Sequence, residues 1–152
     1  MDKNEFKAFC KKEFEARGFK KRKNVFYLLG QDLLCGIELS KSNYGNVYYV
    51  DFFYCIGNYN ESVELPTYYD CDISDRIGVM SKTQTIRGKY YMTAQIEYEE
   101  YTEEELRPFF EKEFEEIILP PVYKGKKYIL DNLGKLYFLT LHKEEVMQKL
   151  QS

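Results

Sequence analysis

The sequence predicts a single α+β domain: an N-terminal helix, an antiparallel sheet of four to five strands and C-terminal helices packed on one sheet face. Three observations lead to this class. Apolar residues have helical spacing over the first 17 positions, three strand-like segments with short connections follow, and helical spacing returns only after Thr102. Consecutive strands with short connections are normally antiparallel neighbours, and segregated helices are typical of α+β domains. At 152 residues, we expect one domain spanning 1–152.

The first helix is expected from about residue 3 to residue 17. Asp2 and Glu5 have the spacing of a capping box, which satisfies free N–H groups at a helix start. Gly18 suits the left-handed position that closes a helix. One helical stripe, which we expect to pack on a sheet, is formed by Phe6, Phe9, Cys10 and Phe14.

Three strands are expected next, at 25–29, 33–41 and 47–56, and the basic run Lys20–Lys23 before them is interpreted as a solvated turn. If Tyr44 and Gly45 form a two-residue hairpin tip, alternate residues of the last two strands make an unbroken apolar face. The predicted pairs on that face are Leu39 with Val50, Ile37 with Phe52, Cys35 with Tyr54 and Leu33 with Ile56. On the other face this register sets Glu38 directly opposite Asp51.

The second half begins with the longest expected loop, from Gly57 to Ser74, and continues with strands at 76–80 and 90–98. A capping-box spacing at Thr102 starts a helix that Pro108 delays or bends and that Pro120 and Pro121 end. Short helices are expected at 129–133 and 146–150, and 135–141 is open between strand and helix.

The composition limits the class of protein. The chain has 22 basic and 25 acidic residues, a net charge of −3, and 15 Tyr and 11 Phe without Trp. The acidic balance argues against a nucleic-acid partner. A charged start without an apolar run, and no stretch near the roughly 18 apolar residues of a membrane span, predict a cytoplasmic protein without a membrane partner. Four cysteines without C-x-x-C spacing are expected to be reduced.

The Glu38–Asp51 pair is the main candidate for a site. Like charges directly opposite on a sheet are unfavourable, and proteins resolve them by exposure to water, by an intervening cation such as Arg76 or Arg87, by a bound metal ion, or by a shared proton. The candidate binding residues are Glu38, Lys41, Ser42, Tyr49, Asp51, Phe53 and Arg76. No residue is predicted to be catalytic.

The other motifs in the sequence do not indicate a cofactor-binding or metal-binding site. Asp70–Asp75 begins like a calcium loop, but Asp75 stands where Gly is needed and Ser81 where Glu is needed. His142 is the only histidine and has no nucleophile motif beside it. Glycine-rich phosphate-binding motifs do not occur. We therefore predict no cofactor.

Several short motifs resemble a bacterial family known only as domain of unknown function 4304. They are Gly18-Phe19-Lys20-Lys21, Phe26-Tyr27, Lys41-Ser42, the polar Asp51 inside an apolar strand, Arg76-Ile77 and Leu119-Pro120. The resemblance runs to about Leu133, and it departs at Ser40, where Gln is expected, and at Asp51, where Asn is expected. It implies no activity, but it adds weight to Asp51 and Lys41-Ser42.

Three functions remain open from the sequence. The leading interpretation is a non-catalytic cytoplasmic binding protein that acts through protein–protein contacts, based on the missing catalytic motifs, the many tyrosines and the long polar loop. The alternative is a small-molecule or metal-assisted hydrolytic site around Glu38, Asp51 and Arg76. The third is weak nucleic-acid binding through Lys20–Lys23. The oligomeric state stays open.

Overall fold

Helix α1 (Lys3–Ala16) opens the chain in the computed structural model, which describes residues 1–152. The predicted capping box is confirmed: the N–H of Glu5 donates to the Asp2 carboxylate at 2.8 Å, and the N–H of Asp2 donates to Glu5 at 3.1 Å. Gly18 has a φ of 93°, which confirms the left-handed helix end. The sequence therefore predicts this helix to within one residue.

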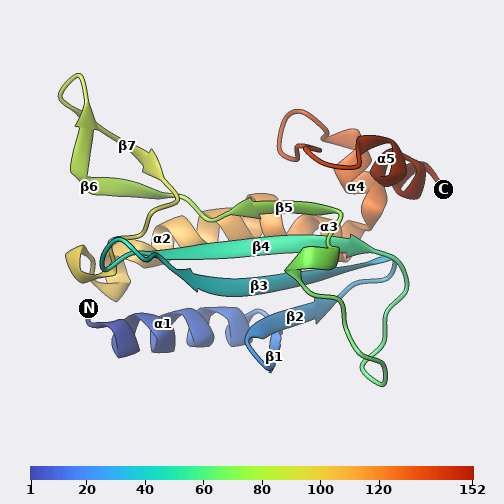
Figure 1. The fold of residues 1–152 in the computed structure, drawn as a ribbon, viewed down its shortest axis with the longest axis horizontal. Helices are drawn as coiled ribbons and strands as arrows, with labels where there is room; N and C mark the ends of the chain where they lie inside the picture. The colour runs from blue at the N-terminus through green and yellow to red at the C-terminus, as the bar shows by residue number, and fades with distance from the viewer.

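A five-stranded antiparallel sheet forms the centre of the molecule, with strand order β1-β2-β3-β4-β5 (Figure 1). Its strands are β1 (Lys20–Arg22), β2 (Val25–Leu29), β3 (Leu33–Lys41), β4 (Tyr48–Ile56) and β5 (Ile73–Arg76). The predicted β3–β4 register is confirmed, with Ile37 opposite Phe52 and Glu38 opposite Asp51. The α+β fold class is confirmed as well.

Two details of the hairpins differ from the prediction. The β3–β4 ladder ends at Lys41 and Tyr48, and one further hydrogen bond joins the Ser42 N–H to the Val47 carbonyl at 3.0 Å, as the register predicts. Residues 43–46 therefore make a longer connection than the two-residue tip expected at Tyr44-Gly45. The basic run is not only a turn: Lys20 to Arg22 form strand β1, paired with β2 at the sheet edge. Charged side chains suit an edge strand because they discourage pairing with other chains, so the charge pattern alone did not distinguish edge from turn.

The main core lies between one sheet face and the helices. Phe9 of α1 meets Phe110 of α2 (Glu103–Glu113) with ring centroids 5.1 Å apart, and Phe14 meets Phe26 of β2 at the same distance. The inward face of β3 and β4 supplies the other side of this core, with Leu33, Cys35, Ile37, Val50, Phe52 and Tyr54. Both α1 and α2 therefore cover the same face.

The other sheet face is covered by the loop between β4 and β5. Here Phe53 lies in a small cluster completed by Val25, Tyr27, Leu34, Cys55 and Leu65. The Phe53 ring occupies the space above Gly36, where an added Cβ would stand 2.2 Å from the ring. Cys35 and Cys55 face opposite sides, as the register predicts, and all four cysteines are free.

Strands β6 (Val79–Ile86) and β7 (Lys89–Thr93) form a separate two-stranded hairpin that stands away from the sheet (Figure 1). The strand expected at 76–80 is thus divided between β5 and β6, and the strand expected at 90–98 ends at Thr93. Beyond it, Ile96 makes one bridge with Tyr48, with both N–H···O distances at 3.0 Å. Alternating apolar residues identify a strand but not its partner, which explains the difference.

The helix expected to end at Pro120 continues instead. A π-helical turn (Phe114–Ile118) leads into α3 (Leu119–Lys124), and Pro108 lies inside α2 without displacing its start. Pro121 has no N–H for the carbonyl of Ile117, the group it would reach in an α-helix. Two tyrosines supply donors here: the Tyr137 hydroxyl donates to the Ile117 carbonyl, and the Tyr54 hydroxyl lies 2.8 Å from the Ile118 carbonyl and 3.1 Å from that of Ile117. These two buried tyrosines thus allow helical backbone across two prolines.

The chain closes with α4 (Lys126–Asp131) and α5 (Lys143–Gln151), at the end of the molecule away from the β6–β7 hairpin (Figure 1). Both short helices were expected, although the first lies a few residues earlier than predicted. The ambiguous segment 135–141 is irregular apart from a bridge between Leu133 and Tyr137. None of the helices has the length and apolar character required to cross a membrane.

Candidate functional site

Asp51 lies at the middle of β4 and is 7% exposed. Its carboxylate accepts a hydrogen bond from Arg76 Nε at 2.7 Å and another from Ser40 Oγ at 2.5 Å. Arg76 is the cross-strand partner of Asp51 in the β4–β5 register, and its guanidinium also lies 4.0 Å from the ring centroid of Tyr49. The hydrogen bond from Arg76 to Asp51 raises the pKa of the guanidinium above its ordinary value.

Glu38 stands opposite Asp51, as the register requires, but takes no part in this ion pair. Partial burial, and secondarily the charge of Asp51, raise the pKa of Glu38 above its ordinary value. Of the four ways to resolve facing carboxylates, the structure uses the arginine and leaves Glu38 half-buried. No three His, Cys, Asp or Glu side chains come together here as a ligand set.

The other predicted site residues do not lie together. They are found on the two faces of the sheet and at the end of the β3–β4 hairpin. Phe53 is fully buried above Gly36 and packs rather than binds. Lys41 is exposed, and its Nζ donates to the Gly45 carbonyl at 2.8 Å. Ser42 and Tyr49 are half-exposed and line a groove at the hairpin end. The predicted set is therefore not one site, but two of its members border a concave surface.

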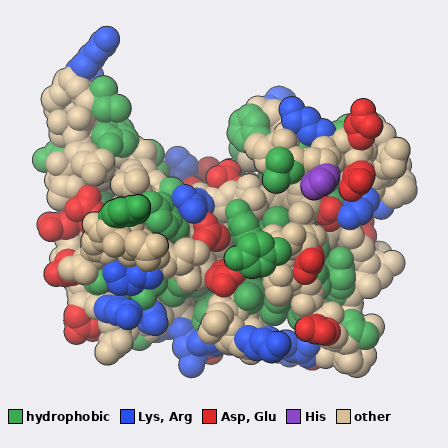
Figure 2. All heavy atoms as spheres, in the orientation of Figure 1, with side chains coloured by type: hydrophobic (Ala, Val, Ile, Leu, Met, Phe, Trp, Pro, Cys, Tyr) green, Lys and Arg blue, Asp and Glu red, His purple; other side chains and the backbone are tan.

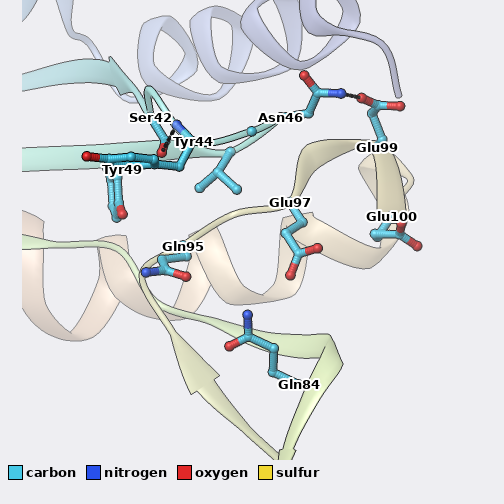
Figure 3. Close-up of a pocket in the computed structure, with 11 residues that line it drawn as sticks. Ser42, Tyr44, Asn46, Tyr49, Gln84, Gln95, Glu97, Glu99 and Glu100 are labelled. Carbon is cyan, nitrogen blue, oxygen red and sulfur yellow. Dashed lines mark hydrogen bonds between the residues drawn. The ribbon is translucent and has the colours of Figure 1, made fainter.

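This surface, the acidic groove, has a volume of about 480 Å³ and lies between the β3–β4 connection and the base of the β6–β7 hairpin (Figure 3). Tyr44 and Tyr49 border it from the β3–β4 hairpin, and Tyr44 is 99% exposed. Figure 3 shows Gln84 and Gln95 on the side away from that hairpin. Three carboxylates complete the lining: Glu97, Glu99 and Glu100.

None of these three carboxylates forms an ion pair with a lysine or arginine. Glu97 accepts from the Thr83 hydroxyl and Glu99 from the Asn46 amide, which are both neutral donors (Figure 3 draws the second). The Glu100 carboxylate accepts no hydrogen bond, and Lys82 Nζ donates to the Glu100 backbone carbonyl instead, at 3.0 Å. The groove therefore presents uncompensated negative charge.

Sequence reasoning missed Glu97, Glu99, Glu100, Gln84 and Gln95. They come from segments separated from Ser42 by more than 40 positions, and they meet because Ile96 bridges to Tyr48. The available signal was local: carboxylates at 97, 99 and 100 are interspersed with Tyr98 and Tyr101 at the end of the expected strand. Such a run at a strand end is also typical of a solvated loop, so it does not indicate a site without the fold.

Comparison with known proteins gives one match. The sequence model of the family described as "Domain of unknown function (DUF4304)" matches residues 10–122 of the chain. No curated protein and no solved structure matches it.

Proposed function

The chain belongs to the DUF4304 family, and we propose that its role is non-catalytic: it acts in the cytoplasm by binding another protein through the acidic groove. The partner surface is basic and presents lysine or arginine side chains to the groove. The observation that carries this proposal is the presence of three carboxylates without an ion-pair partner beside the exposed Tyr44 and the half-exposed Tyr49.

The chemistry of the lining fits a protein partner. Tyrosine is enriched at protein interfaces because it offers a large rigid surface with a polar end. The carboxylates attract a basic partner from a distance and select its orientation. Gln84 supports this reading: its carbonyl oxygen accepts from the Tyr91 hydroxyl at 2.6 Å, so the side chain is held in place before binding.

The hydrolytic alternative at Glu38 and Asp51 has less support. Asp51 is nearly inaccessible and already bonded to Arg76 and Ser40, so neither carboxylate oxygen is available to a substrate or a metal ion. A general base must reach the proton it removes, directly or through one water molecule. The Asp51 network is better explained as a brace for the sheet edge.

A photocrosslinking amino acid at position 44 tests the proposal in the cell that makes the protein. We expect it to capture a discrete protein, and the triple substitution E97Q/E99Q/E100Q in the same chain to abolish the capture. The matched control is the same amino acid at Tyr123, which is 70% exposed and borders none of the cavities described in this structure. Equal capture from both positions, or capture unaffected by the glutamines, would overturn the proposal.

A binding measurement on the purified protein gives a second test. A lysine- and arginine-rich dodecapeptide should shift the amide resonances of 42–49 and 95–100, and the triple glutamine variant should weaken binding by about tenfold or more. Since exposed charges are screened by salt, the affinity should fall as ionic strength rises. Shifts confined to other segments would place the basic partner elsewhere.

A further inference from the structure

A second concave surface, the basic cleft, lies between α1 and the sheet and has a volume of about 440 Å³. It meets the β3–β4 hairpin at Tyr48, whereas the acidic groove meets it at Tyr49. Because successive strand residues point to opposite faces, the two concave surfaces lie on different sides of the hairpin. The polar lining of the cleft is Lys7, Lys11, Lys21, Asn24, Lys41 and one carboxylate, Glu38, which belongs to the opposite sheet face beside Asp51.

Three of these lysines have no acidic partner. The Nζ atoms of Lys7 and Lys41 lie 6.0 and 5.9 Å from the same Tyr48 ring centroid, and Lys21 Nζ lies 5.7 Å from the Phe26 centroid. None of the three forms an ion pair, while Lys11 meets only Glu15, at 3.8 Å on the exposed surface. A helix and two strands thus direct cations to one place in a chain of net charge −3.

The neighbours of Lys21 show that this arrangement is specific to the cleft. Lys20 pairs with Glu61 at 3.1 Å, and Arg22 donates to the backbone carbonyls of Glu61 and Val63, so both hold the loop on the far sheet face. The side chain of Lys21 points to the opposite face of the sheet from those of Lys20 and Arg22, toward α1, and no carboxylate pairs with it there. Figure 2 shows lysine and arginine side chains gathered along the edge of the molecule formed by α1, β1 and β2.

We propose that the basic cleft binds a small ligand that carries two or more phosphate groups. Lysine is a point-charge phosphate ligand, and several separated ammonium groups match several phosphates better than one. The Asn24 amide can add a neutral donor. A cavity of this volume is within the usual range for small-molecule sites.

The rings in the cleft favour a small ligand over a nucleic-acid strand. Proteins that bind single strands stack bases on exposed aromatic rings. Phe26 and Tyr48 are 5% and 3% exposed, and each already has a lysine above it, so neither is free to receive a base. The inference does not depend on the acidic groove and its partner.

Isothermal titration with inorganic tripolyphosphate and pyrophosphate in low salt tests this inference. We expect saturable binding of tripolyphosphate, weaker binding of pyrophosphate, and a loss of about five- to tenfold in affinity for each of K7A, K21A and K41A. The matched control is K12A: Lys12 is exposed on the same helix, forms no ion pair and borders none of the cavities described in this structure. Melting temperatures of all variants verify that the fold is intact.

Three results would overturn the inference. One is no saturable binding of tripolyphosphate by the unmodified protein at millimolar concentration. The second is an equal loss in K12A and K7A, which would mean diffuse attraction rather than a site. The third is tight binding of a single-stranded RNA dodecamer without binding of tripolyphosphate, which would assign the lysines to a nucleic-acid backbone.

Discussion

Replacing Gly36 by alanine tests the packing of the sheet face that carries Asp51. The φ angle of Gly36 is not in the left-handed region, so the new methyl group acts through space alone. Its Cβ would lie 2.2 Å from Phe53 Cζ and 2.6 and 2.8 Å from the two Cε atoms. Ordinary contacts begin near 3.4 Å, so the ring has to move by more than an ångström.

The expected destabilisation of G36A depends on the contacts that hold the Phe53 ring in place. Phe53 is fully buried in the cluster beneath the β4–β5 loop and meets the Tyr68 ring edge-on, with centroids 6.0 Å apart. Overpacking typically costs about 1–3 kcal/mol, and expulsion of a buried phenylalanine costs about 3–5 kcal/mol, so we expect a loss of about 3 kcal/mol in G36A. This is a large fraction of the roughly 5–15 kcal/mol that stabilises a domain.

Urea denaturation measures the loss, and two further variants identify its cause. In G78A the new Cβ meets nothing closer than 3.6 Å and the backbone is not left-handed, so stability should change by less than about 0.5 kcal/mol. In the background of F53L, which removes the ring, G36A should cost much less than in the unmodified protein. If G36A is as stable as G78A, or costs as much in the F53L background as it does beside the phenylalanine ring, the packing argument is wrong.

Three other substitutions test the polar interactions. R76A should lower the free energy of unfolding by about 1–2 kcal/mol in urea denaturation, because it leaves Asp51 buried beside Glu38 without its cation. An unchanged free energy of unfolding would show that the Arg76–Asp51 ion pair is dispensable. The pKa of Glu38 is raised in the folded state, so the folded protein binds that proton more tightly and loses stability as pH rises through this pKa. E38Q should therefore melt higher than the unmodified protein at pH 7 and equally below pH 4.5, and a constant difference across pH would contradict the assignment. Y54F should cost about 1–2 kcal/mol, because the carbonyl groups beside the prolines lose a buried donor, and a neutral result would show that Tyr137 alone satisfies them.

The fold was predictable wherever one local rule decided it. The capping box and the phenylalanine stripe define α1, and the apolar alternation defines the β3–β4 register, because a shift by one residue would turn Ile37 and Phe52 to the wrong face. The prediction of secondary structure from local sequence was wrong where contacts with distant residues decided the structure. Two prolines end a helix unless other elements supply donors. No sequence pattern reveals that Tyr54, more than 60 positions before them, and Tyr137, after them, both do so.

The candidate site was predictable only in part, for a related reason. The register correctly identified Asp51 as a buried acid opposite Glu38, but the charge that compensates it comes from a strand reached across a long loop. The acidic groove combines a hairpin connection with segments around Gln84 and Glu97. The alternating pattern at 90–98 predicts a strand there, but it does not show which other segments lie beside Glu97. Periodicity describes one element at a time, whereas a groove belongs to several.

Arg76 links the predicted acid pair to the acidic groove. Its Nε is bound to Asp51, which fixes β5 beside β4, and its Cζ lies 4.0 Å from the ring centroid of Tyr49, a residue of the groove wall. A buried ion pair is weak support for stability by itself, because desolvation offsets much of the attraction. Its better-attested use is to specify one arrangement among several. The acid pair found in the sequence is therefore best understood as the brace that positions Tyr49, and the proposed binding surface lies beside this pair rather than on it.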